Sequence, residues 1–174
     1  MAFTPGALAI GLRQVVLTAQ NGTKAEVAVA MSMDFSPEVI SGTLEGNDQI
    51  SAVDSIVRSY TWSLNSGGLD FDARQIIMGT SILTSGDAPN TVHWNSLQGG
   101  QEAPYFQIDA RVLADDGGDV WATLWHCKYT GATEGAAYGQ YWQPNFTGIA
   151  IARGNSNVIA TIRSRETTIN LPIS

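Results

Sequence analysis

The sequence predicts a mainly β fold with one short flanking α-helix. Three observations carry this prediction: apolar and polar residues alternate over 25–35 and 56–64, turn-forming residues separate several such segments, and only one segment, about 69–78, has a helical period. The chain has 174 residues, which is the size of one domain with its own hydrophobic core. We therefore expect a single domain over 1–174.

The alternating segments predict strands with one wetter face. On 25–35 every second residue is apolar or small: Ala25, Val27, Val29, Met31, Met33 and Phe35. On 56–64 the apolar side carries Ile56, Tyr60, Trp62 and Leu64, with Arg58 among them. Further strands are expected at about 7–18, 39–45, 49–55, 105–113, 119–129, 146–153 and 157–169.

Two turns predict hairpins. Residues 115–119 read Asp-Asp-Gly-Gly-Asp, and this composition tolerates a positive φ, so 105–129 is expected to fold as a hairpin. Residues 154–157 read Gly-Asn-Ser-Asn, and they predict a second hairpin that joins 146–153 to 157–169.

The predicted helix carries Leu69, Ala73, Ile76 and Ile77 on one face. Asn65 or Ser66 is expected to cap it, Asp70 and Asp72 suit the positive end of the helix dipole, and Gly79 suits the position after its end. Two stretches have no clear pattern. They are a long loop over 84–104, with a weak strand at 91–94, and the Gly- and Ala-rich residues 130–145.

Composition excludes several classes of function. Nine basic residues face sixteen acidic ones, a net charge of −7, and charged residues make up only 14% of the chain. A general affinity for nucleic acid phosphates or for anionic membranes needs clustered Lys and Arg, so neither is expected, and no membrane anchoring is expected either. The single Cys127 forms no intramolecular disulfide and indicates synthesis in a reducing cytoplasm. The N-terminal residues lack a signal-peptide pattern, and no apolar run reaches membrane-spanning length.

The sequence also indicates that the protein is not an enzyme and holds no metal or cofactor. Only His93 and His126 could act as imidazole bases, and no nucleophile motif or phosphate-binding loop occurs. His126 and Cys127 are adjacent on a predicted strand, so they are expected to point to opposite faces. Asp115, Asp116 and Asp119 lack the spacing of a calcium loop and are interpreted as a solvated turn.

Five tryptophans leave three interpretations open. Trp121 and Trp125 are expected on one face of one strand, and Trp62, Trp94 and Trp142 lie elsewhere. Tryptophans of this kind pack in a core, line a subunit interface or stack on sugars.

Several segments resemble tail tube proteins of long-tailed bacteriophages. Residues 41–52 (SGTLEGNDQISA) are similar to a strand, L-x-G-[DN]-x, strand element of that family. They are followed by an aromatic strand (SYTWSLNSGGL, 59–69) and by a short helix that ends in Gly (LDFDARQIIMG, 69–79). Residues 118–131 (GDVWATLWHCKYTG) and 154–171 (GNSNVIATIRSRETTINL) resemble the last strands of the family. The motifs are loose, but they follow one another in order over most of the chain.

The resemblance implies a β-sandwich or half-open barrel that assembles into rings, usually hexamers. Inner sheets of neighbouring copies then join into a ring barrel, and stacked rings form a hollow tube for DNA passage. The implied partners are further copies, a tape-measure protein, a tail terminator and baseplate or tip proteins, within a virion made in the bacterial cytoplasm. An acidic lumen would keep DNA phosphates off the wall, within about 8 Å at physiological salt.

Contact residues follow from the resemblance. Hairpins and N-terminal arms carry ring contacts in the family, so the arm over residues 1–6 and the hairpin near 45–48 are the main candidates. The predicted contacts are Ala2, Phe3, Thr4, Glu45, Gly46, Asn47, Asp48, Trp94 and Trp142. Asp48 and Asp54 are predicted to face the lumen, although Asp54 shares its strand face with apolar residues. The alternative function is a carbohydrate- or receptor-binding β-sandwich that uses surface tryptophans, such as Trp125 or Trp142.

Overall fold

The computed structural model describes residues 9–46, 49–68, 70–114, 117–165, 167–169 and 171–172. These residues form a mainly β structure with one α-helix, as the sequence predicts, and a short 3₁₀ turn, η1 (Gly154–Ser156). The strands are β1 (Ala9–Ala19), β2 (Lys24–Glu26), β3 (Ala30–Gly46), β4 (Gln49–Ser66), β5 (Ser81–Ser85), β6 (Val92–Ser96), β7 (Tyr105–Ala114), β8 (Asp119–Thr133), β9 (Asn145–Ala150) and β10 (Ala160–Arg165). No helix in the described ranges is long and apolar enough to cross a bilayer.

Eight of the strands form one antiparallel sheet. Its order is β2-β1-β7-β8-β9-β4-β3, and β10 also pairs with β8. The end strands β2 and β3 do not pair with each other, so the described strands leave the sheet open rather than closing it into a barrel. β5 and β6 form a separate two-stranded ribbon.

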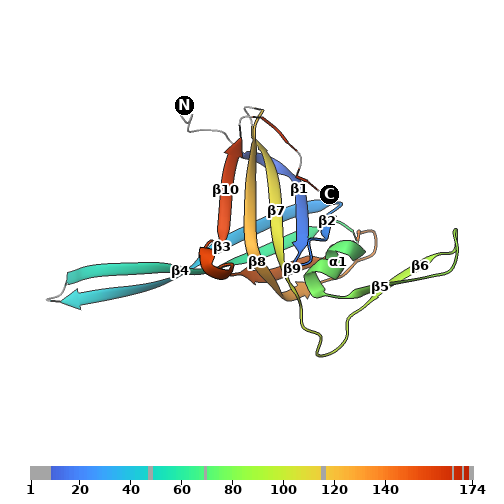
Figure 1. Ribbon diagram of the computed structural model, residues 1–174, viewed down its shortest axis with the longest axis horizontal. Helices are drawn as coiled ribbons and strands as arrows, with labels where there is room; N and C mark the ends of the chain where they lie inside the picture. Colours follow the sequence, from blue (N-terminus) through green and yellow to red (C-terminus); the bar gives the residue numbers. More distant parts are fainter. Residues whose placement is uncertain are drawn as a thin grey trace.

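The sheet bends at β8, because this strand pairs with two different strands along one of its edges. Its first half, from Asp119 to Leu124, pairs with β10, and its second half, from Cys127 to Thr133, pairs with β9. Between the halves two residues of β8 lie opposite one residue of β7, and His126 has a φ of 53°. Such a bulge bends a strand and increases its twist. As a result, β10, β8, β7 and β1 cross the direction of β3 and β4 (Figure 1).

The hydrophobic core lies between these two parts of the sheet. Trp62 of β4 meets Phe106 of β7 edge to face, with ring centroids 5.6 Å apart. Gly148 of β9 lies directly opposite Trp62, and a Cβ at Gly148 would run into the indole ring and into the carbonyl oxygen of Lys128. Only glycine therefore allows the indole to lie flat on β9.

Helix α1 (Phe71–Met78) closes one end of the core, with Ala73, Ile76 and Ile77 buried as predicted. The predicted caps Asn65 and Ser66 are wrong, because both residues belong to β4. Asp70 is the cap, and its carboxylate accepts a hydrogen bond from the Ala73 N–H at 3.0 Å. Gly79 follows the helix with a φ of 74°, as predicted.

Four assignments made from the sequence differ from the structure. The segment 25–35 is not one strand, since residues 27–29 separate β2 from β3, and strands expected separately at 49–55 and 56–64 are both parts of β4. The hairpin predicted around 154–157 is wrong, because β9 and β10 follow each other along the same edge of β8 instead of pairing. The expected loop 84–104 is partly ordered as strand, since β6 extends the weak strand foreseen at 91–94 and pairs with β5.

Candidate assembly surfaces

The most prominent surface feature is the far end of the β3–β4 hairpin. β9 pairs with β4 only from Tyr60 to Asn65, so residues 39–46 and 49–58 continue as a ribbon of two strands, with no third strand beside them among the described residues. We call this ribbon the arm. Eight residues at about 3.4 Å each make it about 27 Å long. Figure 1 shows it projecting from the body at the opposite side from β5 and β6.

The arm exposes apolar side chains on both faces. Residues directly opposite each other in a ladder share a face, so Ile40 and Ile56 lie on one face and Val39 and Val57 on the other. The exposed fractions of Leu44, Val53 and Ile56 are 65%, 66% and 65%. An isolated hairpin is marginally stable in water, and contiguous exposed apolar surface marks an interaction site. This chain's own described residues leave the arm uncovered.

The predicted hairpin contacts fall at the tip of the arm. Glu45 and Gly46 end β3, and the pairing of Gly46 with Gln49 confirms that the chain turns back there. Asn47 and Asp48 lie outside the described residues, as do Ala2, Phe3 and Thr4 of the N-terminal arm. Their contact roles stay predictions.

Asp54 lies on the arm, opposite Gly42, and its side chain is exposed. It shares a face with Ile40 and Ile56, as the alternation predicts. The role of Asp54 in a lumen stays a prediction.

Trp94 and Trp142 lie on two other exposed segments. Trp94 is on β6 opposite Leu83 of β5, and the exposed fractions of these side chains are 40% and 49%. Trp142 lies between β8 and β9, is 39% exposed, and its carbonyl oxygen accepts a hydrogen bond from the Gly68 N–H at 2.7 Å. Both tryptophans are therefore accessible to a partner, whereas Trp62 is buried in the core.

Two long strands present an open edge. The Trp125 N–H of β8 donates to the carbonyl of Ile159, the residue just before β10, at 2.9 Å, and hydrogen-bonded and non-hydrogen-bonded pairs alternate along an antiparallel ladder. The N–H of Thr161 therefore points toward β8 and that of Ile162 points away from it. β3 is also an edge strand, but it contains Pro37, which lacks an N–H, and proline is a common protection of edge strands against pairing. Among the described strands, β10 thus offers the less protected long edge.

A concave face lies on the outer side of β1, β7, β8 and β10. Trp121 and Trp125 share this face, as predicted, and both line one hollow of about 300 Å³. The Arg165 guanidinium lies 4.8 Å from the ring centre of Trp121, and that of Arg153 lies 5.9 Å from Trp125. Neither Arg153 nor Arg165 was predicted to lie on this face, although Arg163 and Arg165 are two residues apart on one strand and therefore share a side of it.

Other polar groups have structural partners. His93 bonds to the Thr84 hydroxyl at 3.0 Å, and the His126 ring stacks on Tyr105 at 4.0 Å. Cys127 is fully buried, and burial raises the pKa of its thiol. The described residues contain no cluster of three or more His, Cys, Asp or Glu side chains that could hold a metal ion.

The interpretation of Asp119 as part of a solvated turn is wrong. Its carboxylate is fully buried and accepts a hydrogen bond from the Ile169 N–H at 2.9 Å. Thr168 donates to the Gly117 carbonyl at 2.8 Å beside it. Asp119 therefore fixes the C-terminal segment against the β7–β8 hairpin, while Asp115 and Asp116 lie outside the described residues.

Comparisons with known proteins give a likeness of shape and no match in sequence. No family model and no curated protein matches the chain. Among solved structures it is similar to the anti-feeding prophage cap (AFP tube terminating cap), determined by cryo-EM, with 13% sequence identity, a TM-score of 0.45, and coverage of 94% of this chain and 99% of that chain.

Proposed function

We propose that this protein is a structural subunit that assembles with copies of itself into rings, and that the rings stack into the hollow tail tube of a long-tailed bacteriophage. The observation that carries the proposal is the arm, which leaves apolar side chains on both faces uncovered. In a monomer the apolar side chains of this ribbon stay in contact with water, whereas a neighbouring copy would bury them. The sequence resemblance of 41–79 to tail tube proteins includes this same arm.

The open sheet supports the same assignment. The arm and the β10 edge lie on different parts of the molecule, so a contact between them is heterologous, with different surfaces on the two copies. Heterologous contacts close into a ring when the rotation between copies closes, and they would supply the missing neighbour of an edge strand.

The charge suits a DNA conduit. A ring of six copies would carry 42 excess negative charges, seven from each chain, and like charge keeps phosphates off a wall. In this scheme the protein acts as a wall and guide, without catalysis or a cofactor. Its partners are other copies, a tape-measure protein, a tail terminator and baseplate or tip proteins within the virion.

Electron microscopy of the purified chain tests the proposal. We expect rings that stack into tubes as protein concentration rises or when a tape-measure protein is added. Monomers at every concentration and in the presence of these partners would contradict it. Single rings that never stack would overturn the tube assignment and indicate a component that ends a tube.

A second candidate is a carbohydrate-binding module, and the hollows beside Trp121 and Trp125 favour it. Sugars stack on a free indole face, but Arg165 and Arg153 already lie over these two rings. Trp142 is more accessible, at 39% exposure. Binding to a glycan array that is lost in Trp125→Ala or Trp142→Ala would favour this candidate over the tube subunit.

A further inference from the structure

We propose that the concave face around Trp125 is the receptor for the arm of a second copy of this chain. This inference rests on the proposed self-assembly and adds which two surfaces meet. We call this receptor the Trp125 face, and it consists of the residues that line three hollows beside Trp125.

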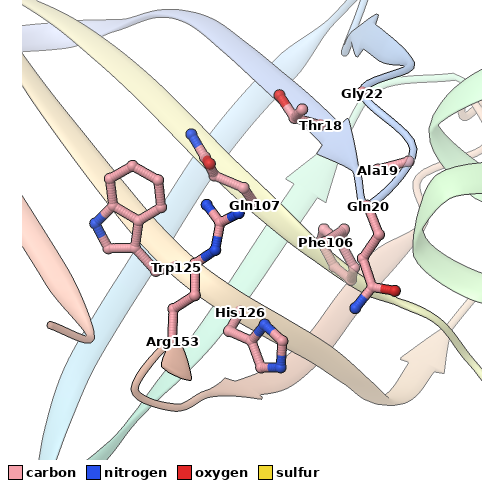
Figure 2. Close-up of a pocket in the computed structure, with 9 residues that line it drawn as sticks. All are labelled: Thr18, Ala19, Gln20, Gly22, Phe106, Gln107, Trp125, His126 and Arg153. Atoms are coloured by element: carbon pink, nitrogen blue, oxygen red, sulfur yellow. The ribbon is translucent and has the colours of Figure 1, made fainter. Parts of the chain in front are cut away.

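Three hollows meet at Trp125. The first, of about 420 Å³, is lined by Thr18, Gln107, His126 and Arg153, and Figure 2 shows these side chains around it. The second, of about 300 Å³, extends past Trp121 and Asp109 to Arg163, and the third, of about 590 Å³, lies between Trp125, Arg153 and Val158. Because Trp125 lines all three hollows, they adjoin around its indole and offer space in which the apolar side chains of a ribbon could be buried.

The Trp125 face gathers positive charge in an acidic protein. Lys24, Arg153 and Arg163 line the hollows, and Arg165 lies over the neighbouring Trp121, so four of the nine basic residues lie here. The carboxylate of Asp109 also lines a hollow, but it accepts hydrogen bonds from Gln107 and Thr123, each at 2.7 Å. The face therefore presents a cationic surface to a partner.

The arm has the complementary composition. Residues 39–58, which are the arm and the turn that closes it, include Glu45, Asp48 and Asp54 against a single basic residue, Arg58. Complementary charge selects the partner and fixes its register, while tryptophan and arginine supply much of the binding free energy in protein interfaces. The arm offers acidic side chains among Val, Ile and Leu, and the Trp125 face offers arginines among indoles.

The position of β10 adds a backbone component. Thr161 and Arg163 of β10 line the third hollow, so an arm seated there lies beside the open edge of this strand. Another hollow, on the outer side of β3, β4 and β9, fits less well. It is lined by Asp34, Ser36, Thr61, Thr147 and neighbouring residues, with a carboxylate and no basic side chain.

Photo-crosslinking of the full-length chain tests where the arm binds. A benzophenone amino acid replaces Ile56 on one arm face or, in a second variant, Val53 on the other, and Leu83 on β5 is the control position. Mixed heavy- and light-isotope copies are assembled, irradiated and mapped by mass spectrometry. We expect inter-copy crosslinks from the arm to residues 121–125 or 153–163 and a different pattern from position 83. Assemblies whose arm crosslinks map to the hollow on β3, β4 and β9, or to another arm, would overturn the receptor assignment and leave self-assembly intact.

Charge reversal gives an independent readout. Arg163→Glu and Asp54→Arg are each expected to raise the concentration needed for assembly at least tenfold, and the double variant is expected to recover part of the loss. Asp87→Arg, an equal change on the exposed β5–β6 turn, serves as the control and is expected to assemble normally. Assembly of Arg163→Glu at the wild-type concentration would overturn the receptor assignment. Failure of the wild-type chain to assemble at all would instead overturn the proposed function, and the inference with it.

Discussion

Removing apolar surface from the arm is expected to weaken assembly without unfolding the monomer. The variant replaces Leu44, Val53 and Ile56 with Thr, which keeps a small side chain suited to a strand at each position. These three side chains are each about two-thirds exposed in the isolated chain. They therefore contribute little to the monomer and have most of their apolar surface left for a partner to bury.

The size of the effect follows from that exposed surface. Full burial of an aliphatic side chain is worth about 1.5–3 kcal/mol, so burying the remaining two-thirds of one is worth about 1–2 kcal/mol. Threonine retains part of this free energy of burial, so we expect a loss of about 1 kcal/mol at each position. Three positions give about 3 kcal/mol for each arm that binds a neighbouring copy. Since about 1.4 kcal/mol is a factor of ten, the critical concentration for assembly should rise roughly 100-fold.

Sedimentation across a concentration series measures the critical concentration, and circular dichroism measures thermal unfolding of the monomer. The matched control is Thr43→Ser, which alters the arm without removing one of its large apolar side chains. The reasoning is refuted if the triple variant assembles at the wild-type concentration. It is also refuted if the monomer unfolds several degrees earlier, because the arm would then be packed within its own chain.

The remaining predictions concern the edge, the core and the buried thiol. Ile162→Pro removes an N–H that points away from β8, so it is expected to block assembly with little change in the melting temperature of the monomer. Thr161→Pro removes a hydrogen bond to β8 and should lower the stability of the monomer by about 1–3 kcal/mol. Equal losses of melting temperature in the two variants would contradict the edge geometry. Gly148→Ala should lower the free energy of unfolding in urea by about 1–3 kcal/mol or more, because the added methyl meets both the Trp62 ring and the Lys128 carbonyl oxygen, and an unchanged midpoint would contradict this packing. Because burial raises the pKa of the Cys127 thiol, a thiol reagent should label it at pH 8 only after unfolding. Rapid labelling of the folded protein would contradict the burial of this thiol. The thiol ionises above about pH 8.5 in the unfolded chain but stays protonated in the folded chain, so the free energy of unfolding should fall as the pH rises past that value.

Local patterns were enough to predict most of the elements. Alternation identified the strand over 56–64, which is part of β4, the turn composition at 115–119 identified the β7–β8 hairpin, and the helical period with Gly79 identified α1 to within a few residues. These features depend on neighbours in the sequence, where side-chain period and turn chemistry decide the outcome.

Features that depend on distant partners were not predictable in the same way. The prediction of a hairpin between β9 and β10 was wrong because β8 is long enough to pair with both strands in succession. No pattern within β9 or β10 indicates the length of the strand with which they pair. Asp119 reads as a turn residue in sequence, but its burial depends on Ile169, fifty residues away.

The assembly surfaces were predicted in part. The hairpin near 45–48 was located from a motif, but its extension into an uncovered arm required knowing that β9 stops at Tyr60. Trp121 and Trp125 were placed on one face by alternation, whereas Arg153 joins them only through the loop that follows β9. Likewise, only the ladder geometry shows that the N–H of Ile162, and not that of Thr161, points outward.

Hydrogen–deuterium exchange of the arm, measured below and above the concentration at which rings form, tests the central claim most directly. Backbone amides in 39–44 and 53–58 should exchange fast in the monomer, as in a two-stranded ribbon without cover, and at least tenfold more slowly once rings are present. Rings that form while these amides continue to exchange at the monomer rate would contradict the claim that the arm is the surface through which copies join.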